Sequence, residues 1–267
     1  MPHHTQAPIF IHSLFRSGST WIFEKFRASP AGYWCYQEPY HEALLQLNTN
    51  PESLLSYSEE TALSLRHPSM TAPYFREFYD IKEKLTGKFD KCISYDSFFD
   101  PQTCPAIFPY TETLIAEAKG NPVLQCCRSF GRVTPLKEQF GGTHILLWRD
   151  PVNQWLSYQI NDYFDATSLA IINAQNPPVI IQRLRQEIGF NEVHAENVQS
   201  EFAAFSEASL DAGQKYLIFY GLWLYHLLEN QPLCEAEINL DMLSRSEEYV
   251  AGKTTGNYSV KIITKST

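Results

Sequence analysis

Residues 9–21 read IFIHSLFRSGSTW, a short apolar run followed by a Ser/Gly turn and the start of a helical pattern. The apolar part, residues 8–14, predicts a buried strand. Residues 19–28 predict a helix, which Ser29 and Pro30 end. A strand, a tight turn and a helix in this order are typical of α/β proteins.

The rest of the chain continues this alternation. Further strands are predicted at residues 33–37, 122–127, 143–148 and 237–240, and helices at 41–47 and over much of 151–230. The pattern predicts a P-loop-like, three-layer α/β/α fold with a central parallel sheet, in which ligands bind at the carboxyl ends of the strands. We expect a single domain over residues 1–267, with a helical, aromatic-rich insertion at about 50–120 and a tail at 252–267.

Composition limits the function classes. The 267 residues carry a formal net charge of −9, from 21 Lys and Arg against 30 Asp and Glu, which argues against a nucleic-acid binder. A few arginines can still attract a small anion, because salt screens distant charges over about 8 Å. No apolar run is long enough to span a membrane. The cysteines show neither CxxC spacing nor a disulfide pattern, which predicts reduced thiols in a cytoplasmic protein: Cys35, Cys92, Cys104, Cys126, Cys127 and Cys234.

The turn after the first strand resembles a phosphate-binding loop. Aligned on GxxxxGK[ST], it keeps the second glycine as Gly18 and the hydroxyl as Thr20, whereas Ser19 replaces the lysine. Backbone N–H groups at such a helix N-terminus bind anions, and Arg16 can supply the missing cation. In the alternative interpretation, Ser17 or Ser19 merely caps the helix.

A second strand-to-helix junction carries an arginine. The strand at 143–148 is followed by Arg149, then by Asp150 and Pro151, which favour the start of a helix. Ser157 lies about two turns along that helix, so that an arginine and a hydroxyl can share one phosphate. The alternative is that Arg149 pairs with a surface carboxylate and Ser157 is solvated.

Together these motifs resemble sulfotransferases that use 3′-phosphoadenosine-5′-phosphosulfate (PAPS). FRSGSTW at residues 15–21 is similar to their 5′-phosphosulfate loop, and LWRDP at 147–151 with Ser157 is similar to their 3′-phosphate motif. QEPYH at 37–41 is similar to the Glu-Pro element of the carbohydrate-type and bacterial members. The resemblance covers about residues 8–165. GKTTG, at 252–256, is only weakly similar to the cofactor-binding loop that the cytosolic members carry late in their sequence.

The resemblance implies a cofactor site and a reaction. Arg16 would contact the bridging oxygen and the leaving 5′-phosphate, and Arg149 and Ser157 would bind the 3′-phosphate. The cofactor-binding residues that it implies are Arg16, Ser17, Gly18, Ser19, Thr20, Trp21, Arg149 and Ser157. No metal ion is expected.

Several side chains compete for the role of general base. Glu38 is favoured because it matches the family element, and His41 and His12 are the other candidates. Arg128, at the end of a predicted strand, would stabilise the transferring sulfuryl group or bind an anionic acceptor. Its alternative role is an ion pair with Glu38 or Glu42.

The sequence therefore predicts an enzyme that transfers a sulfuryl group from PAPS to a hydroxyl or amine of a small-molecule or glycan acceptor. A P-loop kinase of a small metabolite and a non-catalytic nucleotide-binding module with the same fold remain alternatives. The aromatic stretch from Tyr74 to Phe99 either lines the acceptor pocket or belongs to the core.

Overall fold

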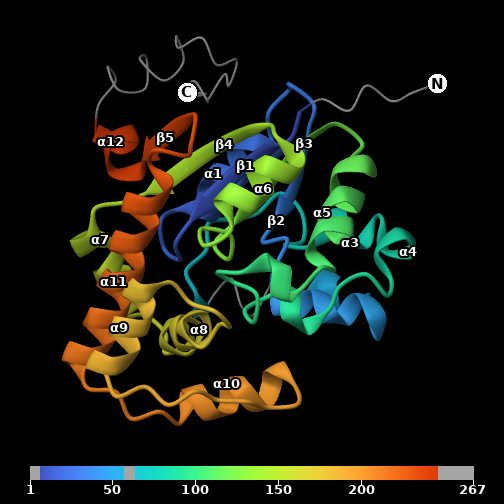
Figure 1. Ribbon diagram of the computed structural model, residues 1–267. Coiled ribbons are helices and arrows are strands. Elements are labelled where there is room, and N and C mark those ends of the chain that lie inside the picture. The colour runs from blue at the N-terminus through green and yellow to red at the C-terminus, as the bar shows by residue number, and fades with distance from the viewer. Residues whose placement is uncertain (1–6, 57–63, 246–267) are drawn as a thin grey trace.

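The computed structural model of the chain describes residues 7–56 and 64–245. A five-stranded sheet with the order β2-β3-β1-β4-β5 forms its centre, and every neighbouring pair of strands is parallel (Figure 1). The strands are β1 (Ile9–Ser13), β2 (Tyr33–Gln37), β3 (Asn121–Cys126), β4 (Thr143–Trp148) and β5 (Ala236–Asn239). The predicted α/β class with a central parallel sheet is confirmed, and each strand lies within one residue of its predicted position.

Helices connect the strands, as expected for parallel pairs. The predicted helix at 41–47 is a 3-10 helix, which begins where His41 accepts a hydrogen bond from the Ala43 N–H. No helix among the described residues is long and apolar enough to cross a membrane. The helices are α1 (Ser19–Arg27), η1 (Glu42–Asn48), α3 (Arg76–Tyr79), α4 (Lys82–Leu85), η2 (Lys91–Ile93), η3 (Pro101–Thr103), α5 (Ile107–Ala116), α6 (Val133–Phe140), α7 (Pro151–Tyr158), α8 (Tyr163–Ile172), α9 (Val179–Glu187), α10 (Val198–Ser206), α11 (Ala212–Asn230) and α12 (Leu240–Arg245).

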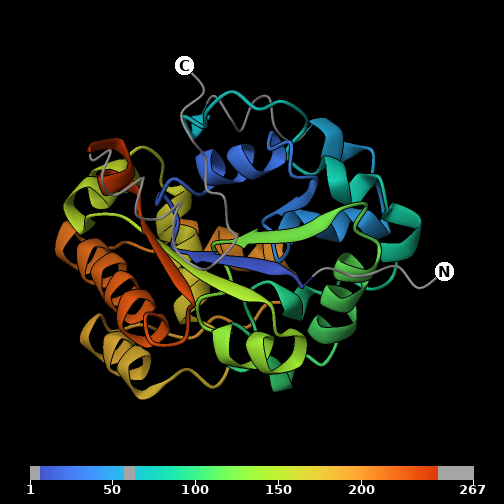
Figure 2. The same cartoon turned by 90° about the horizontal axis from the view of Figure 1, so that it is seen from above.

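The strand residues alternate between two buried clusters, because successive side chains of a strand point to opposite faces. Ile11 of β1 packs in the same cluster as Ile22 and Phe23 of α1. Its neighbour Phe10 belongs to the cluster that contains Leu114 of α5 and Leu136 of α6. Figure 2 shows α1 on one side of the sheet and α5 and α6 on the other. Burial on both faces explains why these strands are short, nearly continuous apolar runs.

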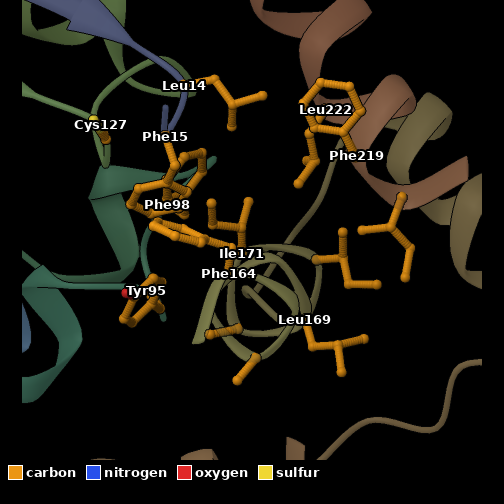
Figure 3. Close-up of a cluster of buried hydrophobic side chains, with 14 of the residues drawn as sticks. Leu14, Phe15, Tyr95, Phe98, Cys127, Phe164, Leu169, Ile171, Phe219 and Leu222 are labelled. Carbon is orange, nitrogen blue, oxygen red and sulfur yellow. The ribbon is translucent and has the colours of Figure 1, made fainter. Parts of the chain in front are cut away.

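A third buried cluster joins the end of β1 to the helices of the C-terminal half (Figure 3). Leu14 and Phe15, directly after β1, belong to it together with Phe164 of α8 and Phe219 of α11. Phe15 and Phe164 have ring centroids 6.1 Å apart. This packing fixes α8 beside the loop that follows β1.

The segment from residue 64 to 120, between β2 and β3, is mostly core rather than pocket. Phe75, Phe78 and Phe98 are completely buried in the hydrophobic clusters. Of the aromatic stretch predicted at 74–99, Tyr74 reaches the pocket described below. The predicted tail at 252–267, with its GKTTG sequence, lies outside the described residues.

Two cysteines depart from the expectation of reduced thiols. Cys92 and Cys104 form a disulfide, because the turn between η2 and η3 brings their Cα atoms to 5.7 Å. The spacing of the cysteines in the sequence did not indicate this turn. Cys35, Cys126 and Cys127 are buried free thiols, and Cys234 is a half-buried one: these four fit the prediction. Disulfides are rare in the cytosol, so this bond counts against the predicted cytoplasmic location.

Candidate functional site

A pocket of about 160 Å³ lies where β1, β2, β3 and β4 end. The segments that follow these four strands all contribute to it, as expected at the carboxyl edge of a parallel sheet. Its lining contains Phe15, Arg16, Gly18, Ser19, Thr20, Trp21, Glu38, His41, Leu65, Arg66, His67, Pro68, Tyr74, Cys127, Arg128, Arg149, Ser157, Tyr163 and Phe164. Apart from the buried Ser17 and His12, every site residue predicted from the sequence is in this lining, so the structure gathers those residues in one place.

The loop after β1 leads into the N-terminus of α1 through a left-handed turn. Gly18 is the N-cap residue with φ of 86°, and no side chain caps the helix there. The alternative in which Ser17 or Ser19 caps α1 is therefore not observed. The positive φ of Gly18 favours glycine, and a Cβ atom there would lie 2.2 Å from Leu240 Cδ2, which would have to move. The uncapped first turn of α1 leaves backbone N–H groups able to bind an anion.

Arg16 connects the two motifs that were predicted to bind phosphate. Its Nε donates to Ser157 Oγ at 2.9 Å across 141 residues of sequence, and its NH1 donates to the Leu65 carbonyl at 2.7 Å. Burial and then the neighbouring Arg149 lower the pKa of Arg16. Two arginines held near each other in a partly buried pocket create a positive potential that favours an anion.

Arg149 emerges at the end of β4, as predicted. Its Nε lies 3.3 Å from Asp241 Oδ1, so the predicted alternative of a carboxylate partner is also observed. Asp150 starts α7 by accepting hydrogen bonds from the N–H groups of Val152 and Asn153. Asp241 Oδ2 in turn accepts the Asp150 N–H, which anchors this strand-to-helix junction to α12.

Glu38 is a buried carboxylate with a strained backbone. Its φ is 52°, and its side chain is 3% exposed. Both carboxylate oxygens lie 3.1 Å from the Cys127 N–H, and Oε2 accepts from Arg128 NH1 at 2.9 Å. Burial raises the pKa of Glu38, although Arg128 opposes the shift. The carboxyl therefore holds a proton at higher pH than an exposed glutamate does.

Arg128 is a buried cation with two carboxylate partners. Its NH1 pairs with Glu38, and its NH2 lies 3.1 Å from Glu42 Oε2. Nε donates to the Tyr95 hydroxyl and NH2 to the Tyr163 hydroxyl, both at 2.8 Å. The predicted alternative, an ion pair with Glu38 or Glu42, is what the structure shows, and both pairs are present.

His41 and His12 occupy different places. His41 lines the pocket, but its Nδ1 accepts the Ala43 N–H at 3.0 Å, and burial lowers its pKa to about 3. The ring is therefore neutral, with its proton on Nε2. His12 lies outside the pocket lining, hydrogen-bonded to Ser129 and His144, and burial lowers its pKa as well.

Sequence reasoning missed several lining residues. Leu65, Arg66 and His67 come from a stretch with no recognisable motif, and His67 stacks on Tyr74 with centroids 5.8 Å apart. Tyr163 follows the turn after α7. The sequence indicated Tyr163 only by its nearness to Ser157, because composition does not predict in which direction the chain turns after α7.

Backbone strain concentrates at this pocket. Four non-glycine residues among those described have positive φ, and three of them line the pocket: Arg16 at 66°, Glu38 at 52° and Arg66 at 50°. Such conformations cost of order 1–3 kcal/mol each and cluster at functional sites. The strain therefore points to the same place as the motifs.

Comparison of the chain with protein-family models, curated proteins and solved structures gives no match. Among the described residues, one group has the spacing of metal ligands, namely Asp90, Cys92 and Cys104. Its two sulfur atoms form the disulfide and are not thiolates, so this group does not fit a metal ion.

Proposed function

We propose that this chain is a PAPS-dependent sulfotransferase with a P-loop-like, three-layer fold. It would transfer a sulfuryl group to a hydroxyl or amine of a small-molecule or glycan acceptor. The observation that carries the proposal is the hydrogen bond of 2.9 Å between Arg16 and Ser157. It joins two motifs that resemble the 5′ and 3′ phosphate sites of one cofactor.

The pocket fits a polyanionic donor. The first turn of α1 lacks a side-chain cap, and Ser17 Oγ is buried with no hydrogen-bond partner among the described residues. Arg16 and Arg149 add two cations beside these donors. Charge-assisted hydrogen bonds of this kind contribute about 1.5–3 kcal/mol each. We assign Arg16, Thr20 and the α1 amides to the 5′-phosphate, and Arg149 and Ser157 to the 3′-phosphate.

The chemistry follows from where charge develops. An acceptor oxygen would attack sulfur in line, forming one S–O bond while the S–O bond to the 5′-phosphate breaks and its electron pair stays with the phosphate. Arg16 would stabilise that leaving charge. Glu38 would take the acceptor proton, since its pKa is raised by burial. His41 is less suited to this role, because its Nδ1 is already an acceptor and its Nε2 carries the proton.

The side chains that line the pocket support a kinase less well than a sulfotransferase. Ser19 stands where kinases keep the lysine, and the lining described above contains a single carboxylate, Glu38. That carboxylate is already held by Arg128. Mg²⁺ in kinases prefers free carboxylate oxygens next to the phosphates.

A thermal-shift comparison tests the donor. We expect 3′-phosphoadenosine-5′-phosphate to stabilise the chain by about 2.7 kcal/mol at 100 times its Kd, and ATP with Mg²⁺ to give little. Arg16→Ala should remove the shift and all turnover, whereas Arg183→Ala, which removes an exposed arginine of α9, should change neither. A shift with ATP alone would favour the kinase, and no shift with either would favour a different binding module.

A second variant tests the base. Glu38→Gln should lower kcat by about a hundredfold or more while the 3′-phosphoadenosine-5′-phosphate shift persists. Radiolabelled PAPS with a panel of phenols, sugars and amines supplies the turnover assay. Full activity in Glu38→Gln would remove Glu38 from the mechanism.

A further inference from the structure

The buried carboxylate of Glu38 and the partly buried carboxylate of Glu42 share one guanidinium at the pocket. Arg128 NH1 contacts Glu38 Oε2 at 2.9 Å, and NH2 contacts Glu42 Oε2 at 3.1 Å. Arg128 is 1% exposed, so water does little to screen these charges. If both carboxylates are ionised, this group of three carries a net negative charge in a dry environment.

The two carboxylates are not held equally. Besides Arg128, Glu42 accepts hydrogen bonds from the hydroxyls of Tyr95 and Tyr163, each at 3.1 Å. An arginine side chain can only donate hydrogen bonds, so the hydroxyl oxygens of Tyr95 and Tyr163 accept from Arg128. Each hydroxyl can therefore donate its own proton to Glu42. Glu42 is thus fixed as an acceptor by three donors, which favours its ionised form.

Glu38 has weaker donors. Its two oxygens share the Cys127 N–H, Oε2 accepts from Arg128 NH1, and the third donor is the Cys126 thiol, at 3.9 Å from Oε2. Because Glu42 already balances the charge of Arg128, ionising Glu38 would add an uncompensated charge to the buried cluster. Loss of a proton from Glu38 is therefore opposed.

We propose that Glu42 is a positioning residue that neutralises Arg128 and thereby keeps Glu38 able to take a proton from the acceptor. This inference rests on the proposed function, in which Glu38 is the base. Tyr95 and Tyr163 contribute by holding Glu42 against Arg128.

The pKa directions of the surrounding groups agree with an ionised Glu42 and a Glu38 that holds its proton more tightly. Burial raises the pKa of Glu38. Burial also acts to raise the pKa of Glu42, but Arg128, His41 and the hydrogen bonds to Glu42 together outweigh it and lower that pKa. The Cys126 and Cys127 thiols and the His41 ring, which lie next to Glu38 and Arg128, are neutral near pH 7, since burial raises the pKa of both thiols and lowers that of His41 to about 3. The charged groups of this cluster are therefore Arg128 and Glu42.

The test measures the proton on Glu38 directly. In the full chain with carbon-13-labelled glutamate, the carboxyl signal absent from Glu38→Gln identifies Glu38, and its chemical shift is followed against pH. Glu42→Gln should lower the pKa of Glu38 by about one unit or more, because Arg128 then pairs with Glu38 alone. The acid limb of the pH profile of kcat should move in the same direction.

Three controls define the outcome. Glu77→Gln removes a different buried carboxylate, the partner of Arg27, and should leave the Glu38 titration unchanged. Glu42→Asp retains the charge and should keep the pKa of Glu38 close to that of the parent protein. If Glu42→Gln does not fold, Tyr163→Phe, which removes one donor to Glu42, should shift Glu38 the same way by a smaller amount.

An unchanged Glu38 titration in a folded Glu42→Gln or Tyr163→Phe variant would overturn the inference, even if the enzyme transfers sulfuryl groups. A shifted titration in a protein that fails to use PAPS would overturn the proposed function and leave the coupling in place. The two failures are thus distinguishable.

Discussion

Arg128 and Arg132 lie four residues apart in the segment after β3, and both are almost completely buried, yet their guanidinium groups are held differently. Arg128 faces two carboxylates and two tyrosine hydroxyls. Arg132 donates instead to three backbone carbonyls, those of Ile93, Ser94 and Ser97.

The difference in partners suits Arg128 to a role in the chemistry of the pocket and Arg132 to a structural role. Burial lowers the pKa of Arg132 to about 10, and the carbonyl dipoles around it do not titrate. The partners of Arg128 do titrate, and two of them, Glu38 and Tyr163, line the pocket. Tyr95 connects the two sites, because it lies within the segment that Arg132 holds and its hydroxyl contacts Arg128.

The largest effect is expected when Arg128 is removed. Arg128→Leu leaves the buried Glu38 and the partly buried Glu42 without a cation, which should lower the free energy of unfolding by about 5 kcal/mol at pH 8. The folded-state pKa values of Glu38 and Glu42 then lie above their unfolded values, so the folded state binds more protons and regains stability as pH falls. Urea denaturation at pH 8 and pH 5 should show a smaller loss, relative to the parent protein, at pH 5. An equal loss at both would contradict this account.

A smaller effect, with less dependence on pH, is expected at Arg132. Arg132→Leu leaves buried carbonyls unpaired and should destabilise the protein by about 3 kcal/mol. Asp96 is a carboxylate near Arg132, but it ranks last but one among the influences on the Arg132 pKa, and the hydrogen-bond partners of Arg132 are carbonyls. The difference from the parent protein should therefore change much less between pH 5 and pH 8 than it does for Arg128→Leu in the same urea experiment. A loss that shrinks as strongly at pH 5 as in Arg128→Leu would mean that the two arginines are not distinct.

The smallest effect is expected at the link between them. Tyr95→Phe removes one hydroxyl that accepts from Arg128 and donates to Glu42, and should cost about 1 kcal/mol. Tyr110→Phe is the matched control, since that hydroxyl bonds only the Pro39 carbonyl among the contacts described. Tyr95→Phe, unlike Tyr110→Phe, should also alter the pH dependence of stability. If the two variants behave alike, Tyr95 does not couple the sites.

The sheet was predictable because its strands are buried on both faces and so read as short apolar runs between turn residues. The pocket residues Arg16, Glu38, Arg128 and Arg149 were predictable for a related reason. Each directly follows a strand or its turn, and the ends of parallel strands meet at one edge.

The remaining contacts depend on chain directions that local sequence does not encode. Asp241 reaches Arg149 from α12, and Leu65 reaches Arg16 from the segment between β2 and β3. The disulfide between Cys92 and Cys104 likewise depends on a turn between two short helices. Periodicity identifies elements, whereas these contacts depend on how irregular segments fold back.

The packing of Leu240 against Gly18 has a consequence for biosynthesis. Leu240 packs against the loop that follows β1, and Asp241 holds Arg149, but both are translated more than 200 residues after that loop. Contacts of such long sequence separation form slowly. A nascent chain therefore carries an incomplete pocket until α12 has been translated, and a ligand of this pocket can stabilise only chains that extend through α12.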